Sequence, residues 1–103
     1  MSEDKRKHRR ISLPLEVVWL GKSGKNEVRT GDVSASGCYI DTIIAVDVGE
    51  RIALKLHLPS GTWIETLGEV VYHYPGIGFG VRFTRMSEAA RQALEQFIAG
   101  QGG

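Results

Sequence analysis

The residues best suited to binding an anion gather at the start of the chain. Residues 1–10 hold two acids and five bases, which gives the segment a net charge of +3; the bases are Lys5, Arg6, Lys7, Arg9 and Arg10. Arginine offers a planar fork of N–H donors that matches phosphate oxygens, and lysine offers a point charge. From composition alone, the partner of such an arm is nucleic acid, an anionic membrane, a nucleotide or only water.

A second polar cluster lies further along the chain. Residues 32–37, Asp-Val-Ser-Ala-Ser-Gly, have the pattern D-x-S-x-x-G. Asp and Ser side chains bond to nearby amides and Gly adopts backbone conformations that other residues avoid, so this pattern alone predicts a turn. The arm contains the pattern R-x-x-x-R, with Arg6 and Arg10 at its ends. Such a pattern is common in basic tails, so each motif by itself is a weak indicator.

Length and composition limit the classes of protein to consider. The chain has 103 residues and a net charge of +1, and 42% of its residues are hydrophobic. These values predict one globular domain. The 93 residues after the arm carry a net charge of −2, so a mildly acidic body bears a basic arm. A single cysteine, Cys38, cannot form an internal disulfide, and no secretory signal or bilayer-length apolar run is visible, so we expect a cytoplasmic protein without membrane insertion.

Signs of enzymatic chemistry are weak. The three histidines, His8, His57 and His73, have no partner at metal-ligand spacing, so no metal site is expected. No nucleophile elbow or phosphate-binding Walker loop occurs. The glycines of residues 76–80 lack dinucleotide-binding spacing and favour a tight turn into a strand. We therefore expect a non-enzymatic protein with no cofactor.

Hydrophobic periodicity predicts a mainly β fold. Strands are expected where apolar residues alternate or β-branched residues gather, at residues 13–19, 27–32, 38–41, 51–58, 62–72 and 77–83. A helix is expected to begin after Ser87 and to stop at Gly100, with Ala90, Leu94, Phe97 and Ile98 on one face. Short strands followed by one amphipathic helix favour a small antiparallel barrel with the helix packed on it.

The order and separation of the two motifs, with a strand pattern between them, resemble the PilZ domain, a bacterial receptor for cyclic di-GMP. Residues 11–17 look like the strand that follows the family's arginine motif, and residues 78–83, Gly-Phe-Gly-Val-Arg-Phe, are similar to its closing G-x-G-h-x-F strand (h, hydrophobic). The resemblance covers about residues 5 to 98. It implies a six-stranded barrel plus a C-terminal helix over residues 12–99, a flexible arm with the R-x-x-x-R motif over 1–11 and a frayed tail over 100–103.

The resemblance also implies a binding site. Arg6 and Arg10 would bind guanine and phosphate, because guanine presents two acceptors, O6 and N7, to an arginine fork. Asp32 would accept hydrogen bonds from guanine N–H donors, and Ser34 would donate to phosphate or to a neighbouring group. Gly37 would permit the turn and a close backbone approach. Ser36 departs from the family, which often has a second glycine beside the last.

The same resemblance implies roles for further residues of the arm and for residues just before the turn at Pro75. Lys5 stands where the family's residue influences ligand number, and a basic residue there favours a stacked pair of cyclic di-GMP molecules. Arg9 either adds a phosphate contact or is solvated. Aromatic residues often stack on the outer base, and Tyr72, His73 and Tyr74 are candidates, with ordinary packing as the alternative.

We therefore expect a cyclic di-GMP receptor that binds the dinucleotide between arm and loop and changes its surface for a downstream protein. One alternative is a nucleotide-independent adaptor that acts only by protein contacts; the intact motifs argue against it. A general nucleic-acid binder would need a basic barrel face with exposed aromatics. The body is acidic, so DNA is not an expected partner.

Overall fold

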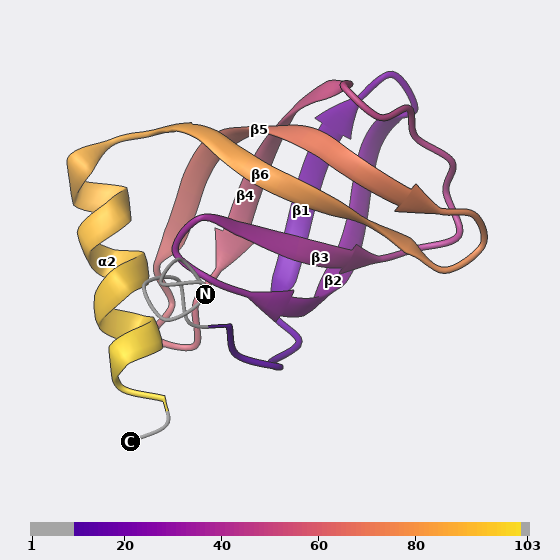
Figure 1. Ribbon diagram of the computed structural model, residues 1–103. Helices are drawn as coiled ribbons and strands as arrows, with labels where there is room; N and C mark the ends of the chain where they lie inside the picture. Colours follow the sequence, from indigo (N-terminus) through magenta and orange to yellow (C-terminus); the bar gives the residue numbers. More distant parts are fainter. Residues whose placement is uncertain (1–9, 102–103) are drawn as a thin grey trace, which may run out of the picture.

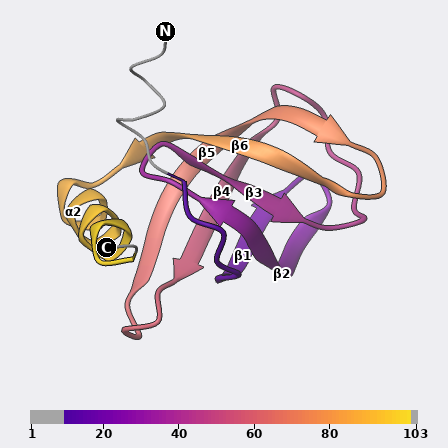
Figure 2. The ribbon, with the colours of Figure 1, turned by 60° about the horizontal axis from the view of Figure 1, so that its bottom comes forward.

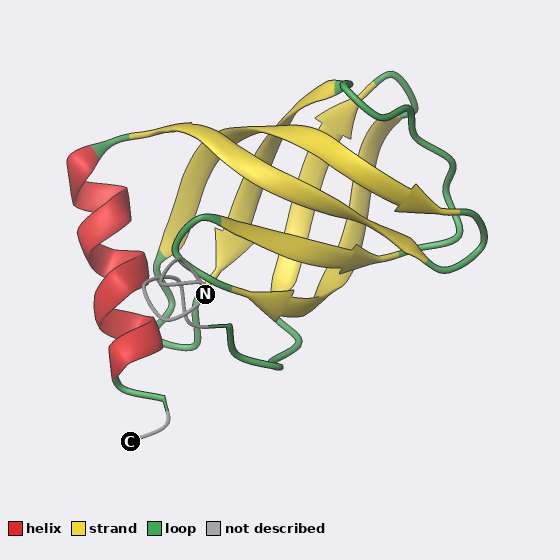
Figure 3. Cartoon of the chain, in the orientation of Figure 1, coloured by secondary structure: helices red, strands yellow, loops and turns green. Residues whose placement is uncertain are grey.

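The computed structural model describes residues 10–101, in which six antiparallel strands close into a barrel followed by one helix (Figure 1). The strands are β1 (Glu16–Gly21), β2 (Gly24–Val33), β3 (Gly37–Asp41), β4 (Arg51–His57), β5 (Trp63–Tyr74) and β6 (Gly78–Met86). Their order around the barrel is β1-β2-β3-β6-β5-β4, and β4 pairs with β1 to close it. The predicted mainly β barrel is confirmed (Figure 3).

The alternation of apolar residues correctly identified the inward-facing positions. Leu15, Val17 and Trp19 are buried at the start of the barrel, and the leucines and isoleucine of β4 are buried as predicted. The first strand begins at Glu16, three residues later than predicted. The reason is visible at Thr30, whose hydroxyl donates to the Leu13 carbonyl at 2.8 Å and accepts from the Leu15 amide at 2.9 Å. These bonds to the Thr30 side chain take the place of regular backbone strand pairing on both sides of Pro14, which has no N–H to donate.

The core lies inside the barrel and extends beneath helix α2 (Glu88–Ala99). Trp19 and Phe79 meet at its centre, edge to face, with ring centroids 5.2 Å apart. Helix α2 begins as predicted, because the Ser87 hydroxyl accepts a hydrogen bond from the Ala90 amide at 3.1 Å. It packs at one end of the barrel through buried residues, Leu94 among them (Figure 2). No helix within residues 10–101 is long and apolar enough to cross a membrane.

Candidate functional site

The structure brings one residue of the arginine motif against the second motif. Ile11 and Val33 form an isolated antiparallel bridge with two backbone hydrogen bonds of 2.9 and 3.0 Å. This pairing holds the chain entering the barrel beside the β2–β3 connection (Figure 2). As a result Arg10 Nη1 donates to Asp32 Oδ1, and the two form an ion pair on the barrel surface. Both side chains keep contact with solvent, at 51% exposure for Arg10 and 31% for Asp32.

Ser34 lies inside the turn that follows Asp32. Its side chain is fully buried, and its hydroxyl accepts hydrogen bonds from the amides of Ser36 and Gly37, each at 3.2 Å. Its own amide donates to the Gly37 carbonyl at 2.8 Å. The Ser34 hydroxyl also donates to the Gly37 carbonyl at 3.3 Å, so Ser34 bonds to groups of the loop and holds the segment between β2 and β3 in a fixed shape.

A glycine is required at position 37 because two strands come very close together there, and not because its backbone is left-handed. A β-carbon on Gly37 would lie 2.2 Å from the Val81 carbonyl oxygen, because β3 and β6 approach closely there. The described glycines with positive φ are others, at positions 24, 49, 61 and 76. The close approach seen here is between β3 and β6, and the positive φ that a turn glycine often adopts is not found at Gly37. The glycine-rich segment at residues 76–80 shows the same kind of close approach, since a β-carbon on Gly78 would lie 2.3 Å from the Ile40 carbonyl oxygen.

A row of outward side chains extends from Asp32 across the wall made by β2, β3, β6 and β5. In register, Asp32 faces Tyr39, Tyr39 faces Gly80, and Gly80 faces Tyr72. The two tyrosine rings are nearly parallel, at 23°, with centroids 6.2 Å apart. The Tyr72 ring passes directly over Gly80, where a β-carbon would meet it at 2.3 Å. Tyr74 continues the cluster, with its ring centroid 5.3 Å from that of Tyr72.

The charges of the ion pair act on this row. Burial raises the pKa of Tyr72, the Arg10 guanidinium opposes that change, and the Asp32 carboxylate adds to it. Burial also raises the pKa of Cys38 to about 12, again with Asp32 reinforcing the shift and Arg10 opposing it. An aromatic surface, a guanidinium and a carboxylate therefore lie within electrostatic reach of one another. This combination suits a planar heterocycle that bears both hydrogen-bond donors and a negative charge.

Sequence reasoning named two residues that the structure brings into contact, and it did not name a third residue of the row. Arg10 and Asp32 form the ion pair, whereas Lys5, Arg6 and Arg9 lie outside the described residues. Tyr39 was not named as a candidate. Its position between two buried residues, Cys38 and Ile40, is the signal that could have placed it on the outer face.

Comparison with protein families identifies the chain. A model described as the PilZ domain matches residues 4–100, which includes both motifs and nearly the whole sequence. The chain belongs to the PilZ domain family. No protein of the curated set matches the sequence. PilZ domains are binding and receptor domains, and YcgR from Escherichia coli has been solved in complex with c-di-GMP.

Solved structures agree on the fold. The inhibitor of motility MotI/DgrA from Bacillus subtilis has a TM-score of 0.81 and 20% identity; the match covers 93% of this PilZ domain and 50% of that chain. The PilZ domain of YcgR from Escherichia coli, solved with c-di-GMP, has a TM-score of 0.72 and 17% identity, with coverage of 92% and 88%. The PilZ domain of CeSA from a cellulose-synthesizing bacterium gives 0.68, 14% identity and coverage of 92% and 99%. The chain thus spans about half the length of MotI/DgrA.

Proposed function

We propose that this PilZ domain is a cyclic di-GMP receptor that holds the dinucleotide between its arm and the loop after Asp32, and thereby changes the surface it offers to a partner protein. The observation that carries the proposal is the ion pair of Arg10 with Asp32, fixed by the backbone pairing of Ile11 with Val33. That pairing brings the end of the arginine motif to the acid of the loop motif. The solved YcgR domain with c-di-GMP supports the choice of ligand.

Each charged group has a matching part of the ligand. The Asp32 carboxylate suits the N1–H and N2–H₂ donors of guanine, and the Arg10 fork suits guanine O6 and N7 or a phosphate. Without ligand, the two groups satisfy each other. A guanine that donates to Asp32 frees the guanidinium for an acceptor on the same ligand, so binding exchanges one exposed ion pair for several charge-assisted hydrogen bonds.

The remaining arm residues complete the proposal. Arg6 supplies the second fork, Arg9 contacts phosphate, and Lys5 favours a second, stacked ligand molecule. Fixing each arm residue costs about 1–2 kcal/mol of backbone entropy, so several charged contacts are needed to offset it. A segment ordered by its ligand is a surface that a downstream protein can recognise. Ser34 acts through the shape of the loop, and Gly37 through the close approach of β3 and β6.

Titration calorimetry with cyclic di-GMP tests the proposal directly. We expect saturable binding, much weaker binding of GTP and of the linear dinucleotide, and weaker discrimination against the adenine analogue in Asp32→Ala. Arg10→Ala should weaken binding by about 1.5–3 kcal/mol, the value of a hydrogen bond to a charged group. Arg51→Ala is the matched control, because Arg51 is an exposed arginine on β4, the strand opposite β3 in the barrel order.

Both arginine variants should retain the melting temperature, since exposed arginine side chains contribute little to stability. The absence of saturable heat at high protein concentration would reject the receptor and favour the nucleotide-independent adaptor. Equal losses in Arg10→Ala and Arg51→Ala would indicate a general charge effect instead of a site.

A further inference from the structure

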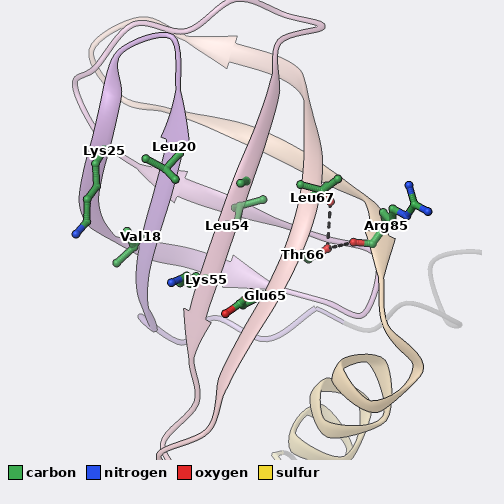
Figure 4. Close-up of a pocket in the computed structure, with 10 residues that line it drawn as sticks. Val18, Leu20, Lys25, Leu54, Lys55, Glu65, Thr66, Leu67 and Arg85 are labelled. Carbon is green, nitrogen blue, oxygen red and sulfur yellow. Dashed lines mark hydrogen bonds between the residues drawn. The ribbon is translucent and has the colours of Figure 1, made fainter.

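A second surface lies on the barrel wall formed by β1, β4 and β5. Leu20, Ala53 and Leu67 face one another in register across these three strands. The two leucines point outward and remain 51% and 46% exposed. They lie on either side of β4 and border a hollow of about 410 Å³ (Figure 4). An apolar row of this kind at the base of a hollow is typical of an interaction surface and not of scattered surface residues.

The rim of this hollow is positively charged. Lys25, Lys55 and Arg85 line it, together with one acid, Glu65 (Figure 4). Lys55 and Glu65 are opposite in register, yet no ion pair within the described part of the chain includes any of these four side chains. The rim therefore presents three cations without an internal partner on a body whose sequence is net acidic. We call the apolar row and this rim the β1–β4–β5 groove.

Because the barrel is closed, it limits the ways in which a partner can bind to this wall. β1, β4 and β5 each have hydrogen-bonded neighbours on both sides, so a peptide cannot join the sheet as an added strand. A partner must instead insert side chains into the hollow, as an amphipathic helix does with residues at i, i+3, i+4 and i+7. A concave surface can accept a convex ridge of side chains from a partner. Insertion into a bilayer instead requires apolar groups that protrude from the surface.

We infer that the β1–β4–β5 groove docks an amphipathic helix of a partner protein, whose aliphatic ridge contacts Leu20, Ala53 and Leu67 and whose flanking acids pair with the cationic rim. The Arg10–Asp32 pair lies at β2 and β3, whereas the groove is centred on β4, the strand opposite β3 in the barrel order. The groove residues are not part of the proposed nucleotide site, so the inference does not rest on the proposed ligand.

Two matched synthetic helices test this inference on the full chain. Each has about 20 residues, long enough to form a helix, with leucines on one stripe; one carries glutamate on its flanks and the other lysine. In a titration followed by amide chemical shifts, the glutamate helix should give saturable changes on β1, β4 and β5 and at the rim residues Lys25 and Arg85. The lysine helix should bind roughly tenfold more weakly, because two or three rim pairs are lost.

Three variants localise the effect. Leu67→Lys should weaken binding of the glutamate helix by about tenfold, the loss expected when a buried aliphatic contact is replaced by charge. Ile43→Lys is the control, since Ile43 is 83% exposed in a loop outside the groove. The double change of Lys55 and Arg85 to glutamate should reverse the preference between the two helices, and it leaves the apolar row intact if Leu67→Lys does not fold.

Several results would overturn the inference. These are the absence of saturable shifts with the glutamate helix, equal affinity for both helices, and changes located around Asp32 and Tyr39. Sedimentation with vesicles of anionic phospholipid separates a membrane from a protein partner: vesicle binding that Leu67→Lys abolishes, without helix binding, would assign the groove to lipid. Addition of cyclic di-GMP should leave the helix affinity unchanged.

Discussion

At the scale of single residues, Tyr72 links the aromatic cluster to the charged pair. It shares one row across the barrel wall with Asp32, and the pKa of its hydroxyl responds to Asp32 and Arg10. With the proposed ligand in place, a base can stack on this ring. Tyr72→Ala should therefore weaken cyclic di-GMP binding by about 1–3 kcal/mol, the value of one base–aromatic contact. Titration calorimetry measures the loss.

The control for this prediction is Trp63→Ala. Trp63 is also an exposed aromatic on β5, but its ring stacks on His57 at 4.2 Å on another part of the surface. Its loss should leave nucleotide affinity unchanged. If the unaltered protein binds and Tyr72→Ala binds equally well, Tyr72 has only a packing role over Gly80.

Sequence reasoning could name the candidates at residues 72–74 but could not separate them. The register between β5 and β6 shifts between Val70 and Tyr72. This irregularity changes which side chains face outward: Tyr72 and Tyr74 are exposed, while His73 is half-buried opposite Phe79. A shift of this kind depends on pairing with a distant strand, so a local pattern does not contain it.

At the scale of elements, the contact between β3 and β6 fixes the loop that holds the site. Gly37→Ala would place a methyl group 2.2 Å from the Val81 carbonyl oxygen, a backbone atom that cannot move without separating the strands. We expect the free energy of unfolding to fall by about 3 kcal/mol, as for severe overpacking. Urea denaturation measures the change.

Gly100→Ala is the matched control. It follows helix α2 with φ of −79°, and its added β-carbon would have its nearest contact, the Gln96 carbonyl oxygen, at 3.5 Å. Its stability should change by less than about 1 kcal/mol. Equal stability of Gly37→Ala and the unaltered protein would mean that β3 and β6 can separate there without cost.

The elements themselves followed from local patterns to a large extent. The pattern of apolar residues predicted all six strands, and the capping serine predicted the start of the helix. Both signals are local in the sequence, because one face of each strand must be buried and the first amides of a helix need a hydrogen-bond acceptor. The pairing of Ile11 with Val33 was not predictable in this way. It depends on where the closed barrel brings the chain start, which only the complete topology determines.

At the scale of the whole molecule, the two walls of the barrel have different chemistry. One bears a guanidinium, a carboxylate and tyrosines, and the other bears an apolar row with a basic rim. The net charge of +1 for the whole chain shows neither this difference between the walls nor the basic arm. A domain with two such surfaces could hold the proposed small ligand and the proposed helix at once.

Both walls share one core, and Cys38 reports on its integrity. The side chain is 2% exposed, and burial raises its pKa to about 12 from an ordinary value of 9.0. The folded protein thus keeps the thiol neutral where the unfolded chain ionises it. This contribution to stability is complete below pH 9 and is lost as the pH rises toward 12, by up to about 1.4 kcal/mol per pH unit.

Cys38→Ala isolates this contribution. The variant loses packing at every pH, which lowers stability by a constant amount, but it lacks the ionising thiol. Unfolding free energies from urea denaturation should therefore fall more steeply with pH in the unaltered protein than in Cys38→Ala between pH 9 and 11. The tyrosines are common to both proteins and cancel in the comparison. Parallel curves would show that the thiol ionises within the folded barrel, and hence that water reaches the core between β2, β3 and β6 without global unfolding.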